Sequence, residues 1–201
     1  FIKDKKNLLM MASSSEVYNF PKKIPTDENV EILIPDVFNP RFSYGGTKFI
    51  SELITINYLR KNNSKFKIFR PHNVFGPDMG NEHVIPQLLK KVFSAKIKKN
   101  SNTCNIKIQG SGKETRAFCF IDDAINQIIK IQERGKTNSI FNVGHNKEKS
   151  IIDLLCDFEK IINLKIKTTK SDLKFGSTKR RCPNMKKTYQ ITGSKNSYLK
   201  G

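Results

Sequence analysis

The sequence predicts an α/β fold with parallel strands, and two observations support that prediction. Short apolar runs alternate along the chain with longer segments in which apolar residues recur every three or four positions, which is the pattern of strands connected by helices. The apolar runs also end in polar or glycine-containing loops, as Asn7–Ala12 does at Ser13–Ser15. In parallel sheets, ligands bind beyond the carboxyl ends of the strands. The segments that follow the strands are therefore the candidates for a binding site.

In the first part of the chain, the pattern predicts two strands and one long helix. The first strand covers residues 7–12 and leads into an irregular surface loop between Pro21 and Pro40, because prolines and aspartates favour loops. The helix covers Ser43–Lys61, with Ser43 as its cap. The residues that recur at helical spacing in it are Ile50, Leu53, Ile54, Asn57 and Tyr58. The second strand covers Phe66–Arg70.

The rest of the chain continues the alternation. A helix is predicted at Val84–Ala95, and its apolar face consists of Ile85, Leu88, Leu89 and Val92. The remaining elements are strands at Cys104–Gln109, Ala117–Ile121 and Ser139–Val143, and helices at Asp122–Glu133 and Ile151–Ile162, the last capped by Ser150. The strand-end segments of interest are Ser13–Tyr18, Arg70–Gly76 and Asn142–Gly144.

Length and composition set limits on the class of protein. A chain of 201 residues with 37% hydrophobic residues is long enough to bury a core. It has no run of 18 apolar residues, so we expect no transmembrane helix. Because it begins with Phe1 rather than Met, we expect it to be a piece of a longer protein.

The four cysteines are far apart and form no C-x-x-C pair or metal-ligand spacing with histidine. We therefore expect no metal site and a reducing, cytoplasmic location. Cys119 and Cys156 stand in apolar surroundings and are predicted to be core residues.

The chain is strongly basic, with 37 Lys and Arg against 18 Asp and Glu and a net charge of +19. Such an excess can indicate nucleic-acid binding. However, the lysines are spread over the whole length, and neither a zinc-finger spacing nor an RNA-binding aromatic cluster is present. A general bias toward Lys, Asn and Ile explains the charge better. Nucleic-acid binding remains an alternative, as does an inactive interaction module.

The clearest chemical pattern is Tyr44-Gly45-Gly46-Thr47-Lys48 at the start of the long helix. A separation of four residues places the phenol and the ammonium group on one helix face. A phenol has an ordinary pKa near 10, and lowering it by about 3 units takes about 4 kcal/mol of differential interaction with positive charge. Such a phenolate could act as a general base toward a hydroxyl group. The pair alone is not specific, because many helices contain it by chance.

Four further segments occur around this pair in a definite order: Ser13–Tyr18 before it, and Arg70–Pro77, Gly112–Phe118 and Phe141–Gly144 after it. The ordered set resembles the extended short-chain dehydrogenase/reductase family, in particular its NAD-dependent nucleotide-sugar epimerases, dehydratases and decarboxylases. The resemblance implies the C-terminal half of a Rossmann-type doubly wound parallel sheet with an interleaved small α/β substrate-binding domain. Residues 1–77 would form the catalytic half of the NAD-binding domain. Residues 78–201 would form mainly the substrate-binding cap, with 117–144 returning to the first domain.

The resemblance also implies roles for the residues of the catalytic centre. Tyr44 would be the general base, assisted by Lys48 and by the positive charge of oxidised nicotinamide, and Lys48 would also contact the nicotinamide ribose. Ser14 would orient the 4-hydroxyl group of the sugar and relay its proton. Ser15 and Glu16 stand where the dehydratases of the family carry an Asp-Glu pair.

Other residues would bind the cofactor and the substrate. Arg70, Pro71 and His72 would pass the nicotinamide through main-chain contacts. The resemblance assigns the pyrophosphate of the nucleotide sugar to Asn73, Arg116 and Arg181, since guanidinium groups pair well with phosphate. It assigns the pocket for the nucleotide base to Val84, Ile85 and Pro86.

The chain departs from the family pattern in two places. It lacks the glycine-rich G-x-x-G-x-x-G motif, which grips the dinucleotide pyrophosphate, so we expect the 201-residue chain alone to bind NAD poorly. Asn19 also stands where the family has glycine after Val-Tyr.

The reaction depends on the fate of the 4-keto sugar that oxidation at C4 produces. Ser15 lacks the acid that dehydration needs, and Ser15-Glu16 resembles the pair of UDP-glucuronate decarboxylases. We expect an epimerase or dehydratase-type enzyme, with decarboxylation as the alternative. The substrate would be a nucleotide sugar, most simply a UDP-sugar, and the full-length form would be a homodimer that pairs through the helix beginning at Ser43.

Overall fold

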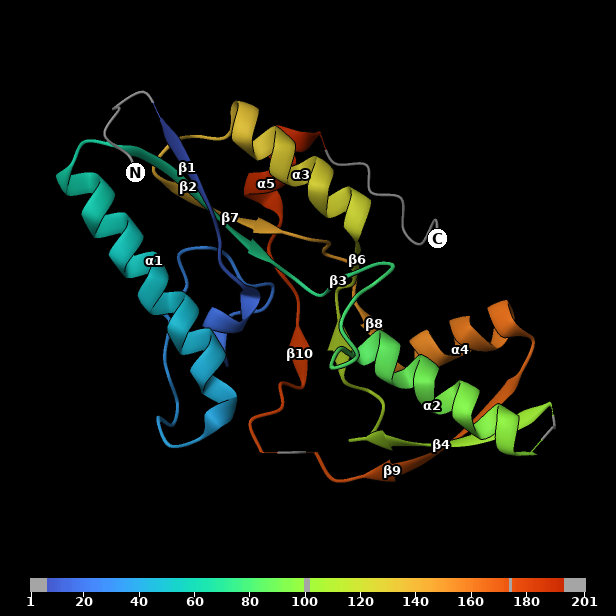
Figure 1. Ribbon diagram of the computed structural model, residues 1–201. Coiled ribbons are helices and arrows are strands. Elements are labelled where there is room, and N and C mark those ends of the chain that lie inside the picture. Colours follow the sequence, from blue (N-terminus) through green and yellow to red (C-terminus); the bar gives the residue numbers. More distant parts are fainter. Residues whose placement is uncertain (1–6, 100–101, 174, 194–201) are drawn as a thin grey trace. The chain divides into compact units, whose positions relative to one another are not determined.

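The computed structural model describes residues 7–99, 102–173 and 175–193 (Figure 1). Within these ranges the chain forms two compact units. The first comprises the residues up to Val74, Ala117–Lys147 and the residues from Arg181 onward. The second comprises Phe75–Arg116 and Glu148–Arg180. The chain thus crosses between the units four times, so that each unit is assembled from segments distant in sequence.

A parallel three-stranded sheet forms the centre of the first unit. Its strands are β1 (Leu8–Ala12), β2 (Lys65–Pro71) and β7 (Ser139–Val143), in the order β1-β2-β7. In the register of the sheet, Met11 pairs with Ile68, and Ile68 pairs with Ile140. The α/β class and the parallel strands predicted from the sequence are therefore confirmed.

Helices cover both faces of this sheet (Figure 1). On one face, Leu59 of α1 (Ser43–Lys61) packs with Phe66 and Ile68 of β2. On the other face, Ala124 and Ile131 of α3 (Ile121–Arg134) pack against β7, and α5 (Lys186–Thr192) lies beside α3. This two-sided covering is what a buried parallel sheet requires.

The shorter elements of the first unit lie at the carboxyl edge of the sheet or lead into α1. They are the 3₁₀ turns η1 (Ser15–Tyr18) and η2 (Pro40–Phe42) and the paired strands β3 (Val74–Phe75) and β6 (Cys119–Phe120). Between η1 and η2 the chain is irregular, as the sequence predicts.

The second unit contains a second parallel pair of strands. Strand β4 (Thr103–Gln109) pairs with β9 (Lys165–Ser171), so that Cys104 lies opposite Ile166. The same unit contains the helices α2 (Val84–Lys99) and α4 (Ile151–Ile162). A small sheet has the order β10-β5-β8 and consists of β10 (Arg180–Arg181), β5 (Thr115–Arg116) and β8 (Lys149–Ser150).

The structure corrects several expectations. Ser43 does not cap α1, because it is the first helical residue and its Oγ donates to the carbonyl of Pro40; Asn39 instead caps the preceding turn η2. The predicted strand at Ala117–Ile121 is reduced to β6, and β9 and α5 were not predicted. Cys119 is buried as predicted, but Cys156 is exposed because α4 turns it outward.

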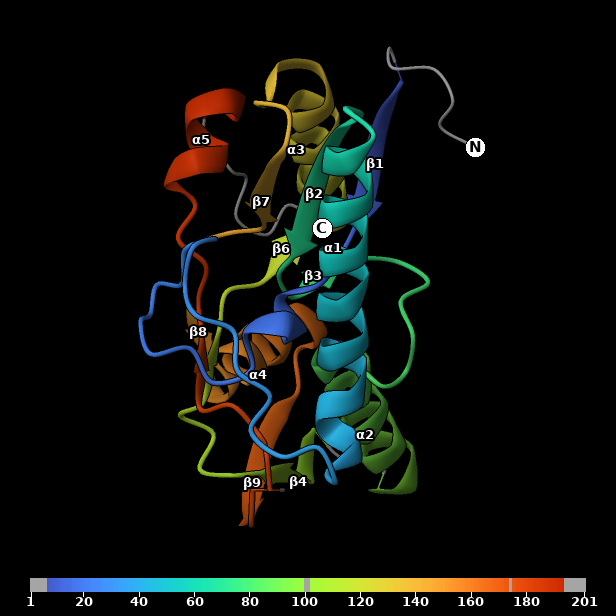
Figure 2. The same ribbon diagram turned by 90° about the vertical axis from the view of Figure 1, so that its left-hand side faces the viewer.

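The row of apolar residues on α1 faces away from the sheet. Ile50, Leu53, Ile54 and Tyr58 are all between 44% and 65% exposed, and Figure 2 shows α1 running alongside β1 and β2. The fully buried residues of the helix are Gly45, Gly46, Glu52 and Leu59. Among the described residues, no helix is both long and apolar enough to cross a membrane.

Candidate functional site at the carboxyl edge of the sheet

The segments that follow β1 and β2 meet at the side chain of Asn142 in β7, which is fully buried. The hydroxyl of Tyr18, at the end of η1, donates to Asn142 Oδ1 at 2.8 Å, and Nε2 of His72, after β2, lies 3.0 Å from the same oxygen. Asn142 Nδ2 donates to the carbonyl of Thr26 at 3.0 Å. The structure thus brings together the three strand-end segments that the sequence singles out.

Burial determines the protonation of these side chains. It raises the pKa of Tyr18 to about 12, although Arg70 acts in the opposite direction. Burial also lowers the pKa of His72 to about 3, against the opposing effect of its hydrogen bond with Asn142. Both side chains are therefore neutral at pH 7, and Nε2 of His72 carries the proton because Asn142 Oδ1 accepts it. These groups hold the edge of the sheet together rather than exchange protons.

Tyr44 and Lys48 lie on the first turns of α1, close to the end of β1. Lys48 Nζ donates to the carbonyl of Ala12 at 3.1 Å and lies 5.9 Å from the centroid of the Tyr44 ring. Tyr44 is 54% exposed, so its phenol is accessible to a ligand. The structure therefore brings this pair together beside the carboxyl end of β1.

Gly45 allows the start of α1 to approach the turn η1 closely. A Cβ atom on Gly45 would lie 2.5 Å from the carbonyl oxygen of Glu16, far inside any normal contact. The residue between Tyr44 and Gly46 must therefore be glycine for the two segments to pack as they do. Sequence reasoning missed this role of Gly45, although a glycine within the first turn of a helix is a recognisable signal of close approach.

The serines that precede η1 differ in their environments. Ser14 Oγ accepts a hydrogen bond from the Glu16 amide at 3.1 Å and so caps the turn, while Ser15 is 4% exposed. Ser13 Oγ is buried and has no hydrogen-bond partner within the described ranges. The turn is thus capped by a side chain of the loop itself, and Ser14 is the one of these three serines that is partly exposed.

Glu16 and Arg181 form an ion pair at this edge. The guanidinium group of Arg181 binds both carboxylate oxygens, with Nη2 and Oε2 3.1 Å apart. Arg181 is 9% exposed. The sequence assigns these two residues to separate tasks, and the structure brings them together across 165 positions of the chain.

Arg70 has a side chain that points into the protein. It is 2% exposed and forms a bidentate pair with Glu52 of α1, with distances of 2.9 Å from Nε to Oε1 and 2.6 Å from Nη2 to Oε2. Its side chain is therefore structural, which leaves only the main chain of Arg70 and Pro71 for a ligand. Glu52 was missed by the sequence reasoning, although it follows Lys48 by four residues.

Asn73 follows His72 in the left-handed region, with φ of 41°. Its Nδ2 lies 3.4 Å from the carbonyl of Ala117, and its own carbonyl accepts from the amide of Cys119 at 3.2 Å. Asn73 is therefore held at the start of β6 in this structure.

The second unit carries the remaining predicted binding residues. Arg116 donates from Nη2 to the carbonyl of Thr178 at 2.6 Å and from Nη1 to the carbonyl of Thr115 at 2.7 Å. Val84, Ile85 and Pro86 form the first turn of α2 and are partly exposed.

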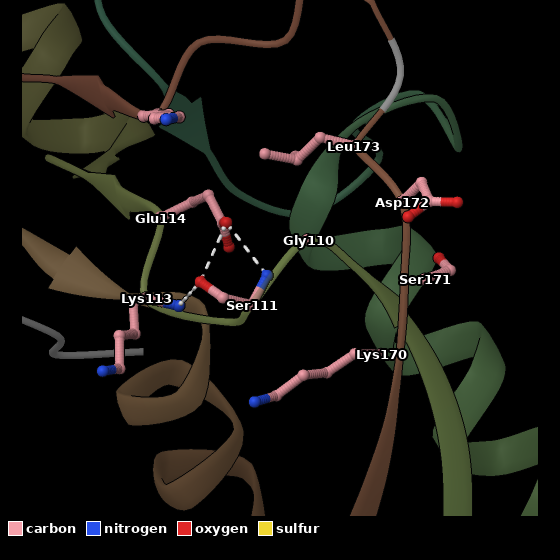
Figure 3. Close-up of a pocket in the computed structure, with 9 residues that line it drawn as sticks. Gly110, Ser111, Lys113, Glu114, Lys170, Ser171, Asp172 and Leu173 are labelled. Atoms are coloured by element: carbon pink, nitrogen blue, oxygen red, sulfur yellow. Dashed lines mark hydrogen bonds between the residues drawn. The ribbon is translucent and has the colours of Figure 1, made fainter.

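The loop before Arg116 borders a cavity of about 600 Å³ (Figure 3). The carboxylate of Glu114 holds this loop, because it accepts from the Ser111 amide at 3.0 Å and from the Gly112 amide at 2.8 Å. Burial alone would raise the pKa of Glu114, but these hydrogen bonds outweigh it and lower the pKa. Figure 3 shows Lys170 and Ser171 at the end of β9, and the following Asp172 and Leu173, on the other side of the cavity. No cluster of metal-ligating side chains occurs among the residues that the structure describes.

The parallel α/β sheet, the Tyr-x-x-x-Lys pair beside the end of β1 and the serine-containing loop before η1 are the features that the resemblance to the extended short-chain dehydrogenase/reductase family predicts. The comparisons with known proteins agree. The family model described as "NAD dependent epimerase/dehydratase family" matches residues 2–144, and the chain belongs to this family.

Relatives with several chemistries are similar to the chain. Human dTDP-D-glucose 4,6-dehydratase is 31% identical over 123 residues, which are 61% of this chain and 33% of that protein. UDP-glucuronic acid decarboxylase 3 of Arabidopsis thaliana is 24% identical over 187 residues, which are 92% of this chain and 52% of that protein. The chain thus spans about half the length, or less, of the curated relatives that it matches.

Solved structures of the same fold are also similar. UDP-glucuronic acid 4-epimerase from Bacillus cereus, in complex with UDP-glucuronic acid and NAD, superposes with a TM-score of 0.81 and 22% identity. The match covers 96% of this chain and 57% of that protein. At this level of identity the similarity shows the fold alone, which is of the Rossmann type.

Proposed function

We propose that the chain provides the catalytic base and substrate-binding residues of an NAD-dependent nucleotide-sugar epimerase or dehydratase. The reaction would begin with transient oxidation of the sugar at C4. One observation carries the proposal: the accessible phenol of Tyr44 and the ammonium group of Lys48 lie together beside the end of β1. The next loop along the edge offers the hydroxyl group of Ser14.

The residues at this edge fit the nicotinamide half of NAD. Tyr44 is exposed beside a strand end, where ligands bind in such sheets, and Nδ1 of His72 is a buried acceptor that lacks a partner in the described part of the chain. Lys48 and Tyr44 would contact the nicotinamide ribose, and the main chain at Pro71 would pass the ring. When bound, the cofactor would take up the hydrogen and electron pair released from C4.

The residues of this chain would handle the proton. Tyr44 would remove the proton from the 4-hydroxyl group, with Lys48 stabilising the phenolate because the two groups are close in space. Ser14 would hold that hydroxyl group in line and relay its proton. A base near neutral pH and a fixed donor-acceptor geometry are what general base catalysis requires.

Charged groups would bind the nucleotide part. Arg116 has its guanidinium plane fixed by two carbonyls, and a planar cation held in one orientation suits a phosphate ligand. Asn73 and Arg181 would add contacts to the pyrophosphate, and the first turn of α2 would line the base pocket. We propose a UDP-sugar as the substrate, since UDP-sugar enzymes are frequent among the similar proteins.

A second candidate reaction is decarboxylation of a UDP-glucuronate. The observation that favours it is the similarity of 92% of the chain to a UDP-glucuronic acid decarboxylase. Several similar proteins are UDP-glucuronic acid decarboxylases.

We also infer that the full-length protein forms a homodimer through α1. Its exposed row of Ile50, Leu53, Ile54 and Tyr58 follows the spacing of one helix face, which can pair with the same face of a second copy. Sedimentation of a Leu53→Lys variant tests this inference: a monomer is expected, and an unchanged dimer would contradict it. We propose a cytoplasmic location, which is consistent with the four free thiols within the described ranges.

The function is tested by incubating the full-length protein with NAD and a panel of UDP-, dTDP- and GDP-sugars. Mass spectrometry distinguishes loss of water from loss of carbon dioxide, and chromatography detects an epimer of unchanged mass. Conversion of at least one nucleotide sugar is expected. If the protein binds NAD and nucleotide sugars but converts none of them, the proposal is wrong.

A further inference from the structure

Glu52 is a buried acidic residue on the helix that carries Tyr44 and Lys48. Tyr44, Lys48 and Glu52 are separated by four residues each, so they succeed one another along one strip of α1. Tyr44 is exposed, whereas Glu52 is 1% exposed. The strip thus begins at the accessible phenol and ends at a carboxylate inside the protein.

The partner of Glu52 is Arg70 at the carboxyl end of β2. Two parallel hydrogen bonds of 2.9 Å and 2.6 Å join the groups. Arg70 Nη1 also donates to the hydroxyl of Tyr18 at 2.9 Å, and Tyr18 donates to Asn142. A continuous chain of buried hydrogen bonds therefore connects α1 with the ends of β2, η1 and β7.

In the first half of α1, Glu52 has the only fully buried side chain larger than that of glycine among the described residues, and Arg70 is its partner. Glycines are the other fully buried residues between Ser43 and Glu52, and the next fully buried side chain is Leu59. Four large apolar residues of the helix, Ile50, Leu53, Ile54 and Tyr58, are exposed. Rotation or sliding of the segment that carries Tyr44 is consequently limited by the ion pair, by the Lys48–Ala12 hydrogen bond and by the contact of Gly45 with η1.

A buried ion pair contributes little to the free energy of folding. Removing two charges from water costs free energy that their attraction repays only partly, and apolar replacements of both partners are often neutral or stabilising. A bidentate guanidinium-carboxylate pair does fix geometry, because both groups are planar. The value of this pair therefore lies in its geometry.

We propose that Glu52 and Arg70 are positioning residues that hold α1 so that Tyr44 and Lys48 stand at the end of β1 in the geometry that the reaction needs. The inference rests on the proposed function, because it assigns a task to that pair. Neither Glu52 nor the guanidinium group of Arg70 would touch the substrate. The two residues would act through the helix.

The test replaces both charges at once, as Glu52→Leu with Arg70→Met, in the full-length protein. The double variant is expected to melt at the same temperature as the wild type and to have a KM within about twofold of the wild-type value. Its kcat is expected to fall on the order of 100-fold, because displacement of a catalytic group by about 1 Å has that effect. A matched control replaces the more exposed pair as Lys149→Met with Asp157→Leu, which lies in the second unit. The control is expected to leave kcat unchanged.

A second readout does not depend on turnover. The NMR signal of the labelled Tyr44 ring, assigned with Tyr44→Phe, is expected to move in the double variant, while that of Tyr58 on the same helix stays in place. A folded double variant with unchanged kcat and an unmoved Tyr44 signal would overturn the inference. If the wild-type protein converts no nucleotide sugar, the proposed function fails and the Tyr44 signal alone decides the positioning role.

A conservative variant covers the case in which the double variant does not fold. Glu52→Asp keeps the charge but shortens the side chain by one methylene, so that α1 must shift to keep the pair. A reduced kcat with unchanged KM is expected. Wild-type kcat and an unmoved Tyr44 signal in this variant would again overturn the inference.

Discussion

Gly45 offers a sharp test of how α1 is placed, because its neighbour Gly46 provides a matched control. A Cβ atom on Gly45 would lie 2.5 Å from the carbonyl oxygen of Glu16, whereas ordinary contact begins at 3.4 Å, so α1 and η1 must move apart by about 0.9 Å. A Cβ atom on Gly46 would meet the Cδ1 atom of Ile34 at 3.3 Å. That atom is the end of a flexible side chain and can move aside.

The two alanine variants share the gain in helix propensity, which is about 1 kcal/mol for each substitution. Gly45→Ala also carries an overpacking cost of about 1–3 kcal/mol, and this cost is the expected difference between the two free energies of unfolding. Since Tyr44 precedes Gly45, the same displacement is expected to lower turnover by about 100-fold. Gly46→Ala is expected to be slightly more stable than wild type and equally active.

Urea unfolding of both variants gives the difference in stability, and turnover of the converted nucleotide sugar gives the difference in rate. The packing argument fails if Gly45→Ala matches Gly46→Ala in both measurements. If the two variants are equally stable but only Gly45→Ala turns over more slowly, the contact of Gly45 with η1 still matters for the site. If they turn over at equal rates but differ in stability, Gly45 has no role in catalysis.

Two further predictions concern stability, and a third concerns the accessibility of thiols. Because burial lowers the pKa of His72 from 6.5 to about 3, its contribution to stability is complete above pH 6.5 and is lost as the pH falls toward 3, by up to about 1.4 kcal/mol per pH unit. Urea unfolding at several pH values gives the slope of the unfolding free energy against pH, and this slope should be smaller in His72→Gln. An equal slope in the wild type and the variant would contradict the assignment. Ser150 caps α4 through a reciprocal capping box with Asp153, so Ser150→Ala is expected to cost about 1 kcal/mol, whereas Ser51→Ala on the surface of α1 should cost nothing; equal losses would argue against the cap. Cys156 is exposed and Cys119 is buried, so a thiol reagent should modify Cys156 rapidly and Cys119 only on unfolding. Comparable rates of modification would contradict the burial of Cys119.

Local patterns were sufficient where the sequence carries its own start and stop signals. The bounds of α1, α4 and β7 agree with the prediction, and Ser150 caps α4 as expected. Strand β9 was missed because Lys165–Ser171 is mostly polar and becomes a strand through pairing with β4, a contact that local propensity does not contain. Helix α5 was missed because Lys186–Thr192 has no apolar period.

The apolar pattern also did not predict which side of α1 faces the sheet. Apolar periodicity marks a face but not what covers it, and here the apolar face is exposed while glycines and Glu52 face inward. The strand-end rule found the three segments that meet at Asn142. The ion pairs Glu16–Arg181 and Glu52–Arg70 join residues far apart in sequence, and a single sequence gives no sign of which charges will pair.

In the proposed reaction, the phenol of Tyr44 is the base that removes the proton from the sugar hydroxyl. The most direct measurement compares wild type with Tyr44→Phe for two quantities: turnover of the nucleotide sugar and the dissociation constant for NAD. We expect turnover to be abolished while the dissociation constant changes little, because the ring and its packing remain and the ionisable oxygen is lost. Substantial turnover by Tyr44→Phe would contradict the claim.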